Sequence, residues 1–213
     1  MQQGILTLLL ALATNGALAQ EVLVNAPEGA TFAVPDSKRT LLGLYVTATE
    51  AYAKWKADPE KVTIIDVRTP EEYIFVGHPE MAWNIPVKVV VYELDGEQRK
   101  VTMKSNPHFV NQVRRVISAT DTVFLICRSG GRSSSAANQL TEAGFKHVFN
   151  VIDGFEGDKV DDPESVFRGK RMKNGWKNAG LPWTYDADPT KMLWPADAGE
   201  QHRPLAMSRD CEK

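Results

Sequence analysis

The chain has 213 residues, of which 24% are charged, and its 25 Lys and Arg against 27 Asp and Glu leave a formal net charge of -2 at pH 7. A balance this close to neutral gives no basic footprint for nucleic acid or for an anionic membrane surface. The length is enough for one substantial hydrophobic core.

The first 19 residues have the pattern of a secretory signal peptide. Residues 1–19 carry no charged side chain, contain an apolar stretch at 5–13, and end on Ala17-Leu18-Ala19, a small-x-small cleavage signal. An uncleaved membrane anchor is the alternative, but the apolar stretch is too short to span a bilayer comfortably. We expect cleavage before Gln20, no stable membrane insertion afterwards, and secretion into an oxidising compartment, most simply a bacterial periplasm.

Apolar periodicity predicts alternating strands and helices after a proline-containing extension at residues 20–43. The expected strands are 45–46, 62–66, 82–85, 123–126 and 148–151, and the expected helices are 49–56, 71–75, 107–117 and 133–143. Asp95-Gly96, set between apolar runs in the segment 87–103, predicts a β-hairpin. Strands that alternate with helices imply an α/β fold, a parallel central sheet with helices on both faces.

The loop after strand 123–126 is the strongest candidate for a functional site. Cys127 ends the strand, and the polar run that leads into the next helix is Arg128, Ser129, Gly130, Gly131, Arg132 and Ser133. Backbone N–H groups at such a helix entry favour an anion or a thiolate, and ligands of open parallel sheets lie beyond the carboxyl ends of strands. Most free cysteines are simply small core residues, but the flanking arginines and glycines favour a reactive Cys127.

Asp66 and Arg68 stand at the end of another predicted strand. Thr69-Pro70-Glu71-Glu72 follows them and has the form of a helix start, so we interpret Asp66 and Arg68 as a cap and an ion pair with Glu71 or Glu72. His78 is expected to be a hydrogen-bonded turn residue. None of the four histidines has a neighbour at metal-ligand spacing, so no metal site is expected.

Four residues separate Cys127 from Arg132, and this loop resembles the active-site loop of the rhodanese (thiosulfate sulfurtransferase) family. Tyrosine phosphatases, and the phosphatases and arsenate reductases built on a rhodanese fold, have five residues in this place, a wider ring that fits a tetrahedral anion. Two further blocks are similar to the family pattern. They are Ile64–Tyr73 with Gly77-His78 and Trp83–Pro86, and then Asp153–Gly157 with Gly175–Pro182. The resemblance predicts a rhodanese-like domain over residues 44–184 and a C-terminal tail at 185–213.

The resemblance implies a sulfurtransferase that needs neither a metal nor an organic cofactor. Cys127 would take the outer sulfur of thiosulfate or of a persulfide and pass it, as a Cys127 persulfide, to cyanide or a thiol. The amides of residues 128–133 would hold the developing anion. Arg128 and Arg132 are the natural partners of a sulfonate group, unless they point to solvent. Asp66 and Arg68 would support the site. A persulfide carrier or redox partner is one alternative, and a rhodanese-fold phosphatase or arsenate reductase is another.

Two outlying features leave alternatives open. Cys211, in the tail, is either an exposed spare thiol or a resolving cysteine that attacks an oxidised or persulfidated Cys127. Residues 158–174 have an acidic half followed by a basic half, and are either a solvated loop and helix start or a segment whose basic half lines the entrance to the site and attracts a dianion. The acidic half is Asp158, Asp161, Asp162 and Glu164, and the basic half is Arg168, Lys170, Arg171 and Lys173.

Overall fold

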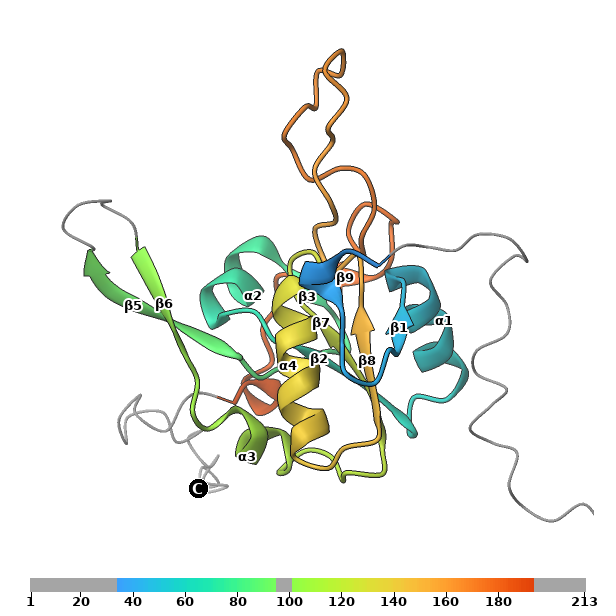
Figure 1. Cartoon of the computed structure of the whole chain (residues 1–213), viewed down its shortest axis with the longest axis vertical. Coiled ribbons are helices and arrows are strands. Elements are labelled where there is room, and N and C mark those ends of the chain that lie inside the picture. The colour runs from blue at the N-terminus through green and yellow to red at the C-terminus, as the bar shows by residue number, and fades with distance from the viewer. Residues whose placement is uncertain (1–33, 95–100, 194–213) are drawn as a thin grey trace, which may run out of the picture. The chain divides into compact units, whose positions relative to one another are not determined.

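A five-stranded parallel sheet forms the centre of the computed structural model, which describes residues 34–94 and 101–193 (Figure 1). The strand order is β1-β8-β7-β2-β4, and all four pairings are parallel. The strands are β1 (Tyr45–Val46), β2 (Val62–Asp66), β4 (Trp83–Asn84), β7 (Thr122–Ile126) and β8 (His147–Val151). The predicted fold class and the five predicted strands are confirmed.

Four α-helices accompany the sheet in the described residues: α1 (Ala48–Ala57), α2 (Pro70–Val76), α3 (Phe109–Val113) and α4 (Gly131–Glu142). Capping boxes start α1 and α2, where the side chain of Thr47 or Thr69 accepts from the backbone N–H three residues on. Helix α3 is shorter than the predicted 107–117. After Val113 the chain closes into tight turns, because the amides of Arg115 and Val116 bond to carbonyls three residues back.

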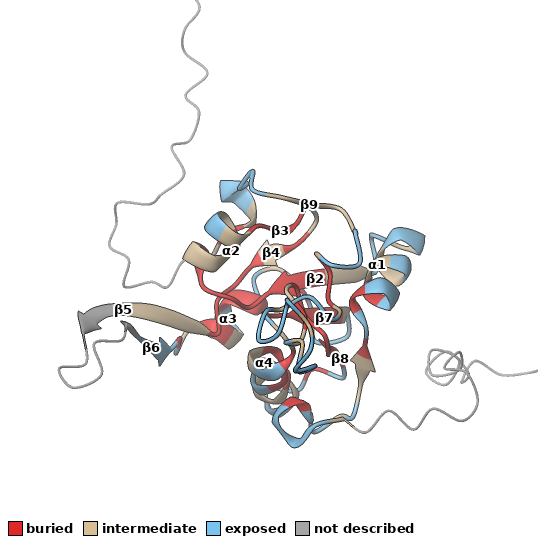
Figure 2. Cartoon of the chain, turned by 90° about the horizontal axis from the view of Figure 1, so that it is seen from above, coloured by how far each residue is buried: buried red, intermediate tan, exposed pale blue. Residues whose placement is uncertain are grey.

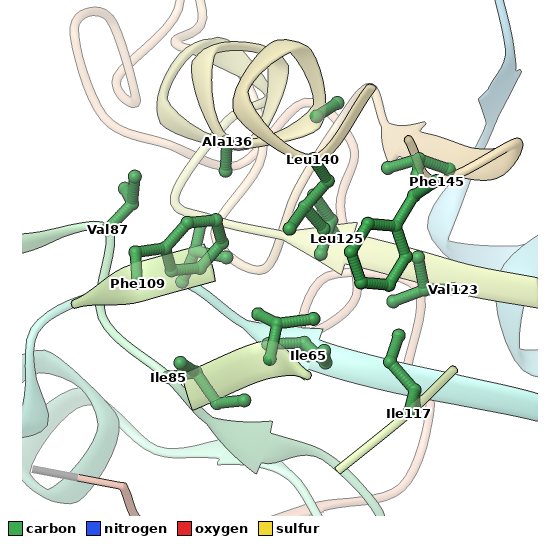
Figure 3. Packing of buried hydrophobic residues seen from close by; sticks show 14 of the residues in the cluster. Ile65, Ile85, Val87, Phe109, Ile117, Val123, Leu125, Ala136, Leu140 and Phe145 are labelled. Atoms are coloured by element: carbon green, nitrogen blue, oxygen red, sulfur yellow. The ribbon is translucent and has the colours of Figure 1, made fainter. Parts of the chain in front are cut away.

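Alternation along β7 divides the core between the two faces of the sheet. Val123 and Leu125 pack with α3 and α4 in one cluster, which Figure 3 shows, while Phe124 and Ile126 pack with α1 in the other. Figure 2 shows the buried strands enclosed between these helices. Because side chains alternate, the residue after Ile126 faces the α4 side. That residue is Cys127.

Smaller elements stand outside the central sheet. The predicted hairpin is confirmed by the antiparallel pair β5 (Lys88–Leu94) and β6 (Val101–Ser105), whose predicted Asp95-Gly96 turn lies outside the described residues. An antiparallel pair that was not predicted joins β3 (His78–Pro79) to β9 (Trp183–Thr184). Two short 3₁₀ turns, η2 (Asp36–Lys38) and η3 (Pro189–Lys191), complete the elements described.

The segment 158–174 leaves the central sheet beyond the carboxyl end of β8, and Figure 1 shows it in orange as a long excursion. Two isolated bridges, between Lys159 and Arg171 and between Val160 and Arg168, hold its two arms together. The helix start expected here is wrong, since the described segment contains no helix. Its central residues are exposed, and the apolar side chains of Val166 and Phe167 among them are not buried, so a helix here would gain little from packing. In the described part of the chain, no helix has the length and apolar character that crossing a membrane requires.

The last part of the N-terminal extension packs along α4. The hydroxyl of Ser134 donates to the carbonyl of Ser37 at 3.1 Å, and the amide of Leu41 donates to Asn138 Oδ1 at 2.8 Å. Lys38 is buried between these contacts, and its ammonium bonds to Asp158 at 2.8 Å. The chain therefore reaches the back of the Cys127 loop before β1 begins.

Candidate active site

Cys127 lies at the carboxyl end of β7 and is 1% exposed. The amide of Gly130 donates to its sulfur at 3.2 Å, and the hydroxyl of Ser133 lies at the same distance. The tight turn depends on Gly130, whose φ is 92° and whose Cβ, if it had one, would lie 2.3 Å from the carbonyl oxygen of Ile152. Helix α4 begins at the next residue. The sulfur thus lies beside the N-terminus of α4, with the Gly130 amide and the Ser133 hydroxyl as hydrogen-bond donors.

Behind the sulfur, Ser133 is held by a residue that the sequence interpretation missed. Asn150, in β8, is fully buried, and its Oδ1 lies 2.6 Å from Ser133 Oγ. Its Nδ2 donates to the carbonyls of Lys38 and Gly130, at 3.0 Å each. These two donations fix the amide so that its oxygen faces Ser133. The sequence feature that could have revealed this role is a polar amide side chain within the otherwise apolar run 148–151.

The loop is fastened from its other side by residues 154–157. The amide of Phe155 donates to the carbonyl of Cys127 at 2.8 Å, and the amide of Glu156 donates to that of Arg128 at 3.0 Å. Gly154 has a φ of 67°, and a Cβ there would lie 2.6 Å from the backbone nitrogen of Ser129. Close approach of these two backbones therefore requires glycine at 154.

Both loop arginines are engaged by glutamates. Arg132, 19% exposed, makes a two-pronged pair with Glu72 at 2.5 and 2.6 Å, and the half-exposed Arg128 bonds to Glu156 at 3.1 Å. Burial alone would raise the pKa of Glu72, but Arg132 and the amide of Thr69 outweigh it and hold that pKa below its ordinary value. The sequence left open whether the arginines point to solvent. In the structure each has a carboxylate partner.

Asp66 and Arg68 form a buried ion pair with each other beside the loop. Arg68 Nη2 lies 2.6 Å from Asp66 Oδ2 and 2.7 Å from the carbonyl of Gly77, and the guanidinium lies 4.3 Å from the centre of the Phe155 ring. The partner predicted for Arg68 was therefore wrong. Arg68 pairs with Asp66, two residues earlier in the chain, and Glu72 pairs with Arg132. Residues two apart at a strand end project to the same side, which brings Asp66 and Arg68 together.

His78 is hydrogen-bonded, as predicted, although it lies in β3 rather than in a turn. It is buried, its Nδ1 lies 2.9 Å from the carbonyl of Tyr73, and its ring stacks on that of Tyr73 with centroids 3.5 Å apart. A carbonyl can only accept, so Nδ1 carries the proton. Burial lowers the pKa of His78 below its ordinary value, which favours the neutral ring. Across residues 34–94 and 101–193, no cluster of His, Cys, Asp and Glu could hold a metal ion.

Other predicted features bear on the site only in part. Residues 1–19 and Cys211 lie outside the described residues. The segment 158–174 and the Cys127 loop both extend from the carboxyl ends of the central strands (Figure 1). Within this segment, Arg171 donates to the carbonyl of Gly157 at 2.7 Å, and the ammonium of Lys173 lies 3.5 Å from Asp161. Arg171 thus has a structural role. Attraction of a dianion by the basic half stays a prediction.

A family model for the rhodanese-like domain matches residues 47–160, a little over half of the chain. The chain belongs to the rhodanese-like domain family. A solved relative, a crystal structure of a protein from M. tuberculosis, is 31% identical to this rhodanese-like protein with a TM-score of 0.52, and the match covers 66% of this chain and 96% of that one. The predicted family is thereby confirmed.

Two curated relatives are similar to this chain in sequence. An uncharacterized protein of Rickettsia conorii is 31% identical over 140 residues, which cover 66% of this chain and 96% of the relative. Thiosulfate sulfurtransferase 16 of Arabidopsis thaliana chloroplasts is 37% identical over 91 residues, which cover 43% of this chain and 68% of the relative. The rhodanese-like protein is therefore similar to members of a sulfurtransferase-type family.

Proposed function

We propose that this rhodanese-like protein transfers a sulfane sulfur through a persulfide on Cys127. The observation that supports this most directly is the environment of the sulfur, which has two hydrogen-bond donors, Gly130 N–H and Ser133 O–H, at 3.2 Å and a helix N-terminus beside it. Hydrogen bonds from these groups stabilise negative charge on sulfur. A thiolate and the terminal sulfur of a persulfide both carry such a charge.

The reaction has two halves. In the first, Cys127 attacks the outer sulfur of thiosulfate or of a persulfide; an S–S bond to Cys127 forms, the S–S bond of the donor breaks, and sulfite or a thiol leaves. In the second, cyanide or a thiol attacks the outer sulfur of the Cys127 persulfide; a bond from the attacking group to that sulfur forms, the S–S bond to Cys127 breaks, and the Cys127 thiolate is regenerated. The loop amides of residues 128–133 stay in place through both halves and hold the anionic sulfur.

Steady-state transfer to cyanide tests this function. With thiosulfate or a persulfide as donor, the wild-type protein should form thiocyanate with the parallel double-reciprocal lines of a two-step exchange. Cys127→Ser should form none above background while keeping the same melting temperature. Retention of a tenth of the activity in Cys127→Ser would exclude Cys127 as the nucleophile.

Transfer to cyanide, measured beside aryl phosphate hydrolysis and arsenate reduction, separates the alternative functions. A persulfide carrier or redox partner would take up one sulfur and then turn over slowly with cyanide. A phosphatase or arsenate reductase would hydrolyse an aryl phosphate or reduce arsenate, which the four-residue spacing between Cys127 and Arg132 disfavours. We expect neither activity to approach the rate of sulfur transfer.

Export is a separate proposal, and it rests on the sequence of residues 1–19 alone. The protein recovered from its native host should begin at or near Gln20, and its mass and N-terminal sequence would show this. Recovery with Met1 intact would overturn the periplasmic assignment.

A further inference from the structure

The ion pairs around the Cys127 loop bear on which donor the site accepts. Four cationic side chains lie near the loop, and each has a carboxylate partner: Arg68 with Asp66, Arg128 with Glu156, Arg132 with Glu72, and Lys38 with Asp158. The four positive charges are thus matched by four negative ones. A fifth cation, Lys177, has its ammonium 3.9 Å from the centre of the Trp183 ring, 5.9 Å from the centre of the Phe155 ring and 3.0 Å from the carbonyl of Val76.

Among the carboxylates that pair with an arginine of the loop itself, Glu72 is firmly placed. It binds both terminal nitrogens of Arg132, it is mostly buried, and its Oε2 also accepts from the amide of Thr69 at 3.3 Å. A bidentate carboxylate and guanidinium fit each other in both charge and shape. An anion that needs Arg132 must therefore compete with a carboxylate that the start of α2 already holds in position.

Thiosulfate and persulfides make different demands on such a site. Thiosulfate is a dianion and releases sulfite, also a dianion, so its binding gains more from uncompensated positive charge than the binding of a monoanion does. A persulfide of a small neutral thiol carries at most one charge, which resides on the sulfurs, and it releases a thiol. The donors at Cys127 are sufficient for that charge without the arginines.

We infer that Glu72 is a specificity-determining residue which, by neutralising Arg132, disfavours dianionic donors and directs the Cys127 site to thiol persulfides. This inference rests on the proposed function and narrows its donor. Glu156 has the same effect, to a smaller degree, on the more exposed Arg128. In the favoured reaction, Cys127 thiolate and R–S–SH give the Cys127 persulfide and R–S⁻, with one S–S bond formed and one broken.

Kinetics with two donors test the inference. The donors are thiosulfate and 2-hydroxyethyl persulfide generated in the assay, and the variant is Glu72→Gln, whose amide oxygen still accepts from the Thr69 amide. Freeing one cation near a dianion should lower the thiosulfate KM about tenfold at low ionic strength. The persulfide KM and both kcat values should change less than about twofold, and added salt should reduce the difference.

The chain offers a matched control in Glu50. It closes the capping box of α1 as Glu72 closes that of α2, with Oε2 2.7 Å from the amide of Thr47. Glu50→Gln removes the same charge and keeps the same kind of cap but frees no arginine of the loop, so both KM values should stay at wild type. Glu156→Gln is the second test, and it should lower the thiosulfate KM even if Glu72→Gln folds poorly.

The outcomes separate the inference from the function it rests on. If Glu72→Gln and Glu156→Gln fold but leave the ratio of kcat/KM for the two donors unchanged, or reduce kcat equally for both, the inference is overturned. If the wild-type protein takes sulfur from neither donor, the proposed function itself fails. A fall in the thiosulfate KM in the two glutamate variants, without a change in Glu50→Gln, supports the inference.

Discussion

Ser133 Oγ lies closer to Asn150 Oδ1, at 2.6 Å, than to Cys127 Sγ, at 3.2 Å. A hydroxyl has a single proton and can donate to one of these acceptors at a time. With a neutral thiol, Ser133 can donate to Asn150 and accept from the S–H. When the thiolate or persulfide forms, the negative sulfur becomes the stronger acceptor and the hydroxyl proton turns to it.

Replacement of Ser133 should therefore slow the reactions of the Cys127 thiolate. A hydrogen bond to a charged group contributes about 1.5–3 kcal/mol, so Ser133→Ala should lower the rate of alkylation by iodoacetamide near neutral pH by about tenfold or more. Ser134→Ala is the control, because the Ser134 hydroxyl lies against the carbonyls of Gly131 and Ser37 and not against the sulfur. Equal rates in wild type and Ser133→Ala would remove Ser133 from the mechanism.

A methyl group at Gly154 should disturb the loop itself. Its Cβ would lie 2.6 Å from Ser129 N and 2.7 Å from the Arg128 carbonyl carbon, and a left-handed backbone costs a further 1–2 kcal/mol or so. Gly154→Ala should therefore lose most of its activity. It should also be less stable than the control variant Gly180→Ala. Gly180 has a φ of 68° with nothing within 4 Å of its would-be Cβ, so it isolates the backbone cost. Similar melting temperatures and activities for the two variants would contradict the fastening role of residues 154–157.

The contiguous parts of this site were predictable from the sequence, and the distant contacts were not. The apolar run 123–126 and the glycine-rich segment after it lie together in the chain, so they predict the strand, the loop and Cys127 directly. The contact of Arg132 with Glu72 joins positions 60 apart, and that of Asn150 with the Lys38 carbonyl joins positions 112 apart. Both depend on the order of strands, which hydrophobic periodicity does not determine.

The same limit explains the wrong partner expected for Arg68. The sequence offers Glu71 and Glu72 as acids in the first turn of α2, and their charge alone does not say which cation they bind. Once β2 and β7 are paired, with Asp66 opposite Ile126, the start of α2 faces the loop after β7. Glu72 then meets Arg132, while Asp66 and Arg68 are enclosed together.

The buried pair Asp66 and Arg68 should contribute to stability more than to chemistry. Asp66→Asn would leave a fully buried guanidinium without its counter-charge, a loss of about 3–5 kcal/mol in the free energy of unfolding. The double variant Asp66→Asn, Arg68→Met should recover much of that loss, because it removes the unpaired charge. Chemical denaturation of the three proteins measures this. A double variant less stable than Asp66→Asn would show that the guanidinium is required for more than its pairing.

Acid should weaken the fold through His78. An unfolded histidine binds a proton near pH 6.5, whereas burial lowers the pKa of folded His78, so the unfolded state binds more protons between the two values. The His78 contribution is complete above about pH 6.5 and is lost as the pH falls below it. Denaturation at about pH 7.5 and pH 5.5 should show a larger loss for wild type than for His78→Asn, whose amide can still donate to the Tyr73 carbonyl. Equal losses would assign the pH dependence to other groups.

The most direct test of the account is the mass of the Cys127 peptide after exposure to a sulfur donor. The account predicts one added sulfur atom on this peptide, removal of that sulfur by cyanide with release of thiocyanate, and no addition in Cys127→Ser. Unchanged uptake and discharge in Cys211→Ser, together with no Cys127–Cys211 disulfide under mild oxidant, would also exclude a role for that thiol as a resolving cysteine. An active protein whose Cys127 peptide never carries the added sulfur would contradict the central claim that transfer passes through a Cys127 persulfide.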